Sequence, residues 1–234
     1  MQIPVFTNND PNQQWDRYCE LLWHNKDLDI WLDISRMHFD SDDLDLLKPR
    51  LKDAFTAQTK LEAGSIANHD EGRQVGHYWL RNSEISPDLS LGTEIKSEIN
   101  SIHEFGKSIC EGTIKTPNGC KFTDVLWIGI GGSGLGPLLI IEALQTYNKG
   151  LSFHFLDNVD PAGITDTLQS IKNKIKKTLV VTVSKSGGTP EPRIAMQQSR
   201  HFLELEGGVW SAQSVAITMK DSHLYKHAEE EEWL

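Results

Sequence analysis

The stretch from Asp124 to Pro137 constrains the fold of this chain more than any other. It reads Asp-Val-Leu-Trp-Ile-Gly-Ile-Gly-Gly-Ser-Gly-Leu-Gly-Pro, and its first half is a short apolar run with β-branched and aromatic residues. Such a run is typical of a strand that is buried on both faces of a parallel sheet. The run ends in Gly131-Gly132-Ser133-Gly134, and a helical pattern of leucines follows. The sequence therefore predicts a strand at 124–130, a glycine-rich turn, and a helix at about 134–147.

This turn has the features of an anion site. Glycines permit positive φ and let an anion approach backbone N–H groups, and the next helix points its positive end at the same place. Two alternatives stay open on this stretch alone. The spacing Gly129-x-Gly131-x-x-Gly134 also fits a dinucleotide fingerprint with Asp157 as the ribose-binding acid, and a tight turn without a ligand has the same pattern. A Walker A loop is excluded, because no Lys-Ser/Thr pair follows the glycines.

A second loop of the same kind follows a predicted strand at 178–183. It reads Ser184-Lys185-Ser186-Gly187-Gly188-Thr189-Pro190. Hydroxyls, a lysine and two glycines at the carboxyl end of a parallel strand form an anion site, and Thr189-Pro190 fits the start of another helix. Two such loops on neighbouring strands can converge on one phosphate, which a dinucleotide site would not require. A serine-rich turn with two caps is the alternative without a ligand.

The pattern around these loops predicts the fold class. Further strands are expected at about 151–156 and 214–218, with helices opened by Asp160-Pro161 and Asp221-Ser222. The first of these helices is expected to reach Lys174, and the helix after the first loop to end in an Asn148-Lys149-Gly150 cap. Repeated β-α units imply an α/β fold with a parallel sheet and helices on both faces. We therefore predict an α/β domain at 116–234, entered by a turn at residues 116–119.

The first 115 residues are predicted to be a helical N-terminal region. The evidence is apolar spacing in three segments. The first helix carries Trp15, Tyr18, Cys19, Leu22 and Trp23, and the second carries Leu44, Leu47, Leu51 and Phe55. The second is expected to follow an acidic start at residues 40–45, with Pro49 near a break or a start. Residues 70–82 suggest a packed helix on which Arg73 and His77 share a face. An exposed connection at 83–93 and another helix at 94–112 complete the region.

Composition limits the partners of the chain. A net charge of −10 argues against a nucleic-acid partner, because the phosphates would be repelled. No segment approaches the roughly 18 apolar residues of a membrane span, and the N-terminus lacks a signal-peptide pattern. The three cysteines, Cys19, Cys110 and Cys120, have no metal-binding spacing and are expected to be free thiols of a cytoplasmic protein. We expect neither a metal nor a cofactor.

The two loops together resemble those of the glucose-6-phosphate isomerase family. The glycines and Ser133 match the first loop of the family, and residues 184–189 match its phosphate-binding loop. Residues 70–82 resemble its Glu-Gly-Arg…His…Leu-Arg helix, and Asn158-Val159-Asp160 matches the segment after its second strand. The Ser-Gly-Gly-Thr-Pro-Glu-Pro form is similar to that of bacterial, cyanobacterial or plastid members.

This resemblance implies both a fold and a function. The fold is a three-layer α/β/α sandwich of the sugar-isomerase type, usually in a homodimer. The function is the interconversion of glucose 6-phosphate and fructose 6-phosphate, a step of glycolysis and gluconeogenesis. The sugar phosphate is implied to bind to eight residues, namely Gly132, Ser133, Ser184, Lys185, Ser186, Gly187, Gly188 and Thr189.

The catalytic part of the family pattern has no match in this chain. The family continues with a Gly-Gly-Arg motif and a catalytic glutamate, histidine and lysine, and none of Glu191, His201, His223 and His227 matches them. We therefore expect no catalytic residue here, and expect the chain to be the N-terminal part of a longer isomerase whose first sugar-isomerase domain is incomplete. A non-catalytic phosphosugar-binding regulator and a nicotinamide-dependent oxidoreductase are the alternatives.

Overall fold

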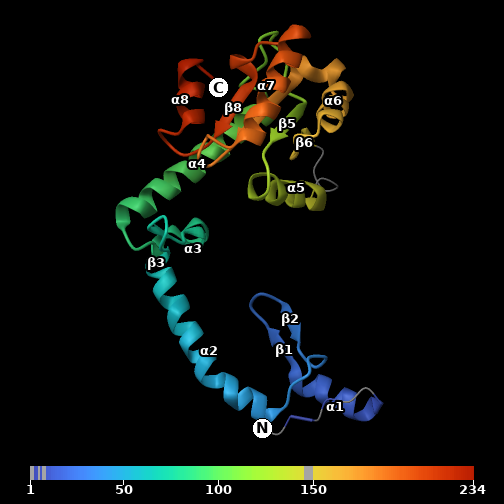
Figure 1. Cartoon of the computed structure of the whole chain (residues 1–234), viewed down its shortest axis with the longest axis vertical. Helices are drawn as coiled ribbons and strands as arrows, with labels where there is room; N and C mark the ends of the chain where they lie inside the picture. The colour runs from blue at the N-terminus through green and yellow to red at the C-terminus, as the bar shows by residue number, and fades with distance from the viewer. Residues whose placement is uncertain (1–2, 5, 7–8, 145–149) are drawn as a thin grey trace. The chain divides into compact units, whose positions relative to one another are not determined.

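The structure is a computed structural model that describes residues 3–4, 6, 9–144 and 150–234. The chain divides into two compact units, Met1–Ile99 and Asn100–Leu234 (Figure 1). Helix α4 (Leu89–Glu111) contains the point of division. The boundary after residue 115 stays a prediction. None of the helices in the described part is long and apolar enough to cross a bilayer.

The second unit is built on a four-stranded parallel sheet. Its strands are β5 (Asp124–Ile128), β6 (Ser152–Leu156), β7 (Thr178–Val183) and β8 (Ser214–Ile217), in the spatial order β6-β5-β7-β8. The predicted α/β class is therefore confirmed. Strands β5 and β7 are direct neighbours, with Val125 opposite Leu179. The two glycine-rich loops thus leave adjacent strands, as the sequence predicted.

Side chains alternate between the two faces of this sheet, and each face has its own apolar core. One core holds Leu126 and Val180 from the strands. It is completed by residues of α6 (Pro161–Ser170), α7 (Pro190–Leu205) and α8 (His223–Glu230), including Ile164, Leu168, Ala195, Met196, Leu203 and Leu224. The other core holds Val125, Leu179 and Val181 with Ile109 of α4 and Phe122. Helices therefore cover both faces of the sheet.

The helices of this unit differ in their ends from the predicted ranges. Helix α5 (Gly132–Leu144) starts two residues before the expected position. The predicted end at 147 and the cap residues Asn148 and Lys149 lie outside the described residues. Asp160 caps α6 by accepting a hydrogen bond from the N–H of Gly163 at 2.8 Å. That helix ends at Ser170, before the predicted Lys174, because the chain tightens into the 3₁₀ helix η2 (Lys172–Lys177) that leads into β7.

In the first unit, the prediction of one helical face from Trp15 to Trp23 is wrong. Helix α1 (Pro11–Leu21) is followed by an antiparallel hairpin of β1 (Leu22–Asn25) and β2 (Ile30–Asp33). The hairpin pairs Trp23 with Leu32, and Asp29 takes a φ of 49° in its turn. Trp23 faces Leu32 and the Trp31 ring stacks on His24, and this pairing across the hairpin overrides the local helical spacing.

Helix α2 (Ser41–Glu62) is one continuous helix. Pro49 lies inside it, so the predicted break or start at this residue is wrong. A proline there removes one intrahelical hydrogen bond at a cost of about 3 kcal/mol, which a helix of this length tolerates. The predicted acidic start is confirmed, because Asp40 is the N-cap and forms a capping box with Asp43.

The predicted helix over 70–82 is wrong in its first half. Strands β3 (Ile66–Asn68) and β4 (Arg73–Gln74) form a short hairpin with Gly72 at a φ of 63°, and α3 covers only His77–Arg81. Arg73 therefore lies in a strand, shares no helical face with His77, and pairs with Glu71 at 2.7 Å. The 3₁₀ helix η1 (Ser83–Ile85) and the first turn of α4 occupy the predicted connection at 83–93.

Candidate functional site

The first loop is a tight turn between β5 and α5, as predicted. Gly131 has a φ of 56°, a left-handed conformation that glycine adopts without strain. A side chain at Gly134 would overlap the carbonyl of Gly129, so the helix approaches the strand end closely. Ser133 lies in the first turn of α5, and its carbonyl accepts a hydrogen bond from the indole N–H of Trp127 at 2.8 Å. The loop is therefore fixed from beneath by a strand residue.

The second loop, residues 184–189, is here called the serine loop. Ser184 is buried, and its hydroxyl donates to Thr189 Oγ1 at 3.2 Å. Gly187 has a φ of 67°, and the N–H of Gly188 donates to Ser186 Oγ at 3.2 Å. Thr189 occupies the N-cap position of α7 as predicted, but its side chain makes no cap hydrogen bond. Its hydroxyl instead accepts the hydrogen bond from Ser184 within the loop.

The segment between β8 and α8 fixes the serine loop from one side. Thr218 Oγ1 donates to the carbonyl of Ser184 at 2.7 Å, and the N–H of Met219 donates to the carbonyl of Lys185 at 3.2 Å. A side chain at Gly187 would overlap the backbone nitrogen of Leu224. The loop conformation is therefore specified by contacts with residues 218–224 as well as by its own hydrogen bonds.

A cavity of about 420 Å³ lies between the serine loop, α7 and α8. Its lining residues are Thr182, Ser184, Gly187, Gly188, Thr189, Pro192, Arg193, Met196, Gln197, His223, Leu224 and His227. Four of the eight predicted phosphate-binding residues, Ser184, Gly187, Gly188 and Thr189, are in this lining. The other four, Gly132, Ser133, Lys185 and Ser186, are not. A volume of this size is within the range of small-molecule sites.

The sequence analysis did not single out Thr182 or Arg193, and it set aside His223 and His227. A signal for three of them existed in their spacing. His223 and His227 are four residues apart on α8, and Arg193 and Gln197 are four apart on α7, so each pair shares a helical face. Thr182 carried no signal, because a threonine within a β-branched strand is ordinary.

A small recess lies where the ends of β5 and β6 face the start of α7. It is lined by Gly129, Asp157 and Glu191, among others. Glu191 therefore lies beside the first loop, not in the cavity.

The opposite end of the sheet holds a buried ionic cluster. Asp124 is fully buried, and its Oδ1 lies 2.9 Å from His154 Nε2 and 3.3 Å from Lys174 Nζ. Its Oδ2 accepts a hydrogen bond from Thr123 Oγ1 at 2.7 Å. Burial raises the pKa of Asp124, but the hydrogen bonds from His154, Thr123 and Lys174 outweigh it and hold the pKa below its ordinary value. The amino end of β5 thus carries a paired charge.

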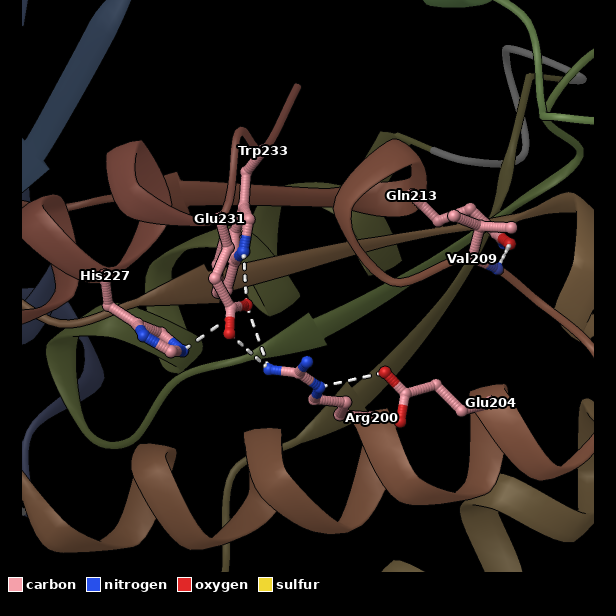
Figure 2. Close-up of polar contacts among 7 residues, drawn as sticks. All are labelled: Arg200, Glu204, Val209, Gln213, His227, Glu231 and Trp233. Carbon is pink, nitrogen blue, oxygen red and sulfur yellow. Dashed lines mark hydrogen bonds and ion pairs between the residues drawn. The ribbon is translucent and has the colours of Figure 1, made fainter.

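A second network fixes α8 to α7 (Figure 2). Arg200 Nη1 lies 2.7 and 2.9 Å from the two carboxylate oxygens of Glu231, and Arg200 Nε lies 2.9 Å from Glu204. The indole N–H of Trp233 donates to Glu231 at 3.2 Å, and His227 Nε2 lies 3.7 Å from the same carboxylate. The hydrogen bonds that Arg200 donates to Glu231 and Glu204 raise the pKa of Arg200, although burial opposes them. This network therefore holds α8, which forms one wall of the cavity, in place through residues that are outside the cavity lining.

The described residues contain no group of three or more His, Cys, Asp or Glu that could hold a metal ion. Cys19, Cys110 and Cys120 are free thiols, as predicted.

Comparison with known proteins identifies the family. A family model described as "Phosphoglucose isomerase" matches residues 33–223. A glucose-6-phosphate isomerase from Synechococcus sp. (strain CC9605) is 56% identical over all of this chain, which covers 44% of that protein. A glucose-6-phosphate isomerase from Parasynechococcus marenigrum (strain WH8102) is 54% identical over all of this chain, which covers 42% of that protein. The chain thus spans less than half the length of these relatives.

Solved structures support the fold. The crystal structure of a glucose-6-phosphate isomerase from Chlamydia trachomatis D/UW-3/Cx matches 83% of this chain and 38% of its own, with a TM-score of 0.71 and 24% identity. A hypothetical protein from Thermus thermophilus matches 82% of this chain and 39% of its own, with a TM-score of 0.58 and 26% identity.

The fold and the loops define a class, the parallel α/β sandwich whose adjacent strands end in glycine-rich turns and helix N-termini. Within that class, the match over residues 33–223 assigns the chain to the phosphoglucose isomerase family. This assignment agrees with the resemblance and removes the basis for the dinucleotide alternative, which required only the glycines of the first loop.

Proposed function

We propose that this chain is part of an isomerase that interconverts glucose 6-phosphate and fructose 6-phosphate. The observation that carries this proposal is the 56% identity, over the whole chain, to a relative named glucose-6-phosphate isomerase. The role of the chain is to bind the phosphate of the substrate. This phosphate binds to Gly132 and Ser133 of the first loop and to residues 184–189 of the second.

The geometry of the serine loop supports this role. Ser184 and Thr189 hydroxyls lie 3.2 Å apart, so both point to one region at the N-terminus of α7. The N–H groups of Gly187 and Gly188 donate within the loop, to Ser184 O and Ser186 Oγ at 3.2 Å each, so the proposed phosphate contact rests on the hydroxyls and on the dipole at the N-terminus of α7. Each hydrogen bond to a charged phosphate is worth about 1.5–3 kcal/mol.

Phosphate binding alone does not isomerise a sugar. Moving the carbonyl between C1 and C2 through an enediol requires a base, an acid–base pair that opens the ring, and a positive group near the oxyanion. Glu191, His201, His223 and His227 do not match the catalytic residues of the family. Binding energy at the phosphate positions the substrate, and it accelerates the reaction only where the chemical groups are present.

A coupled isomerase assay tests this division of roles. We expect residues 1–234 alone to show no activity above background, and the longest form that the gene encodes to be active. Activity of residues 1–234 alone would place a base within them, and Glu191 would be the first residue to replace because it lies beside the first loop.

Calorimetry tests the phosphate assignment separately. Glucose 6-phosphate should bind, and glucose should bind far more weakly, because only the former reaches the loop hydroxyls with a charged group. Equal affinity for the two sugars would refute the assignment of residues 184–189. Binding of glucose 6-phosphate by a full-length protein that lacks activity would favour the non-catalytic regulator instead.

The remaining features of the proposal follow the family resemblance. We propose a cytoplasmic homodimer that uses no cofactor and binds no nucleic acid. The net charge of −10 supports the last point, since nucleic-acid phosphates would be repelled.

A further inference from the structure

The serine loop supplies no permanent charge to the cavity. The residues that it contributes to the lining are Ser184, Gly187, Gly188 and Thr189, and Lys185 is outside that lining. A phosphate ester carries a charge of about −1.5 to −2 at pH 7. Neutral hydroxyls and a helix dipole compensate only part of such a charge, so the cavity requires a cation from outside the loop.

Arg193 of α7 is the cation in this position. It is the one permanently charged residue among the described residues that line the cavity, and no Asp or Glu is among them. This composition contrasts with that of the whole chain, which has a net charge of −10. Because the lining contains no carboxylate that could neutralise it, the guanidinium is available to an anionic ligand.

The two arginines of α7 differ in their partners. Arg200 Nε lies 2.9 Å from Glu204, and Arg200 Nη1 lies 2.7 Å from Glu231. Arg193 is exposed, and no ion pair joins it to a carboxylate within the described part of the chain. Arg200 therefore has a structural partner within the fold, and Arg193 has none there.

The position of Arg193 in α7 is unfavourable for a cation. It is the fourth residue of a helix that begins at Pro190, and the positive end of the helix dipole is close to it. Arginine is favoured at the opposite end of a helix. The stability of α7 therefore does not account for Arg193, whereas an anion at the start of the helix would compensate both positive charges.

We propose that Arg193 is a specificity-determining residue of the substrate site, whose guanidinium binds the phosphate of the sugar. The inference rests on the proposed function and extends it, since Arg193 is not one of the eight residues to which the sequence assigned the phosphate. A guanidinium presents paired N–H donors that fit two phosphate oxygens. Arg193 thus makes the site select a phosphorylated sugar over a neutral one.

Steady-state kinetics of the longest gene-encoded form with fructose 6-phosphate test the role of Arg193. Arg193→Gln should raise KM at least about tenfold and leave kcat within about twofold, because the phosphate is bound equally in the ground state and the transition state. Arg193→Lys keeps the charge without the paired donors and should give an intermediate KM. Lys226→Gln is the matched control, since Lys226 is an exposed cation of α8 outside the lining, and it should change neither quantity.

Calorimetry with inorganic phosphate measures the same contact without the sugar. Arg193→Gln should weaken phosphate binding by the factor by which it raises KM. Added NaCl should weaken phosphate binding by the parent more steeply than by Arg193→Gln, because salt screens the lost charge pair. The melting temperature of Arg193→Gln without ligand should equal or exceed that of the parent, since the variant removes a cation from the positive end of α7.

Three results would overturn the proposal. One is an unchanged KM together with unchanged phosphate affinity in Arg193→Gln. Another is an equal loss of phosphate affinity in Lys226→Gln, which would indicate a general effect of net charge. The third is a lowered melting temperature of Arg193→Gln with an unaltered salt dependence, which would show that the arginine stabilises the fold. If the parent lacks isomerase activity, the proposed function fails, but the phosphate titration still tests Arg193, so the two failures are distinguishable.

Discussion

The two ends of the parallel sheet are built in opposite ways. At the amino end, Asp124 is fully buried and every oxygen of its carboxylate has a partner, from Thr123, His154 or Lys174. At the carboxyl end, the loops after β5 and β7 each contain a glycine of positive φ, Gly131 and Gly187, and the buried hydroxyl of Thr182 has no partner among the described residues. Strand β5 therefore begins in a paired ionic cluster, and the loops at the carboxyl ends of β5 and β7 are built on glycines. Ligand sites of open α/β sheets lie outside the carboxyl ends of the strands.

The largest expected effect is at the carboxyl end. Gly187→Ala should destabilise the fold by about 2–5 kcal/mol, because a left-handed alanine costs about 1–2 and the overlap with Leu224 about 1–3. Urea unfolding measures the change. Gly119→Ala is the control, because Gly119 has a similar φ of 72° but open space around it. This variant should be destabilised only by the cost of a left-handed alanine, about 1–2 kcal/mol. Equal losses in both would mean that α8 does not confine the serine loop.

The next effect is at the amino end. Asp124→Asn should lower the free energy of unfolding by about 1.5–3 kcal/mol at pH 7, because it removes charge-assisted hydrogen bonds from His154 and Lys174. Affinity for glucose 6-phosphate should not change. Asp166→Asn on exposed α6 is the control. A loss of affinity in Asp124→Asn would contradict the division of the sheet into two ends.

The same variant has a defined pH dependence. Hydrogen bonds hold the pKa of Asp124 below its ordinary value of 3.8, so the folded state favours the ionised form. The stabilisation is therefore fully present above pH 3.8 and is lost as the pH falls through the lower folded pKa. The difference in stability between parent and variant should narrow only in that acidic range.

A smaller effect on binding is expected from Thr189→Val. It should weaken binding of glucose 6-phosphate by about 1–3 kcal/mol, since one hydroxyl donor to the phosphate is lost. The start of α7 should survive, because the Thr189 side chain makes no cap hydrogen bond. Calorimetry with the parent protein gives the reference. Unchanged affinity together with intact helix content would remove Thr189 from the proposed phosphate site.

The smallest effect is expected from Lys174→Gln. The lysine side chain is 55% exposed, so water screens its attraction to Asp124. The variant should therefore lower the free energy of unfolding by less than about 1 kcal/mol. Asp124 keeps the bonds from His154 and Thr123 in this variant. A loss as large as that of Asp124→Asn would show that Lys174, not His154, dominates the cluster.

The sequence predicted the carboxyl end of the sheet better than the amino end. Glycines and hydroxyls directly after β-branched runs are a local signal, and the loops at 131–134 and 184–189 follow adjacent strands as expected. The Asp124 cluster has no local signal, because His154 and Lys174 reach Asp124 only through the register of the sheet and the turn after α6.

The first unit shows where local spacing fails. Trp23 fits a helical face with Trp15, but the structure pairs it with Leu32 in a hairpin. Arg73 and His77 have helical spacing, yet Gly72 turns the chain and places Arg73 in a strand. Long-range pairing overrides short apolar periodicity in both places.

The strand order β6-β5-β7-β8 also determines when each strand of this sheet can pair during synthesis. Strand β5 is made first, yet it lies between two strands that come later, and Asp124 pairs with both Ser152 and Thr178. Parallel pairs require a crossover before any ladder bond forms, so loop closure must precede the stabilising contacts. On the ribosome, the apolar run of β5 stays open to misassociation until residue 183 has emerged. The strand that carries the first loop is therefore the first strand of this sheet to be translated, but it is enclosed only after β7 is made.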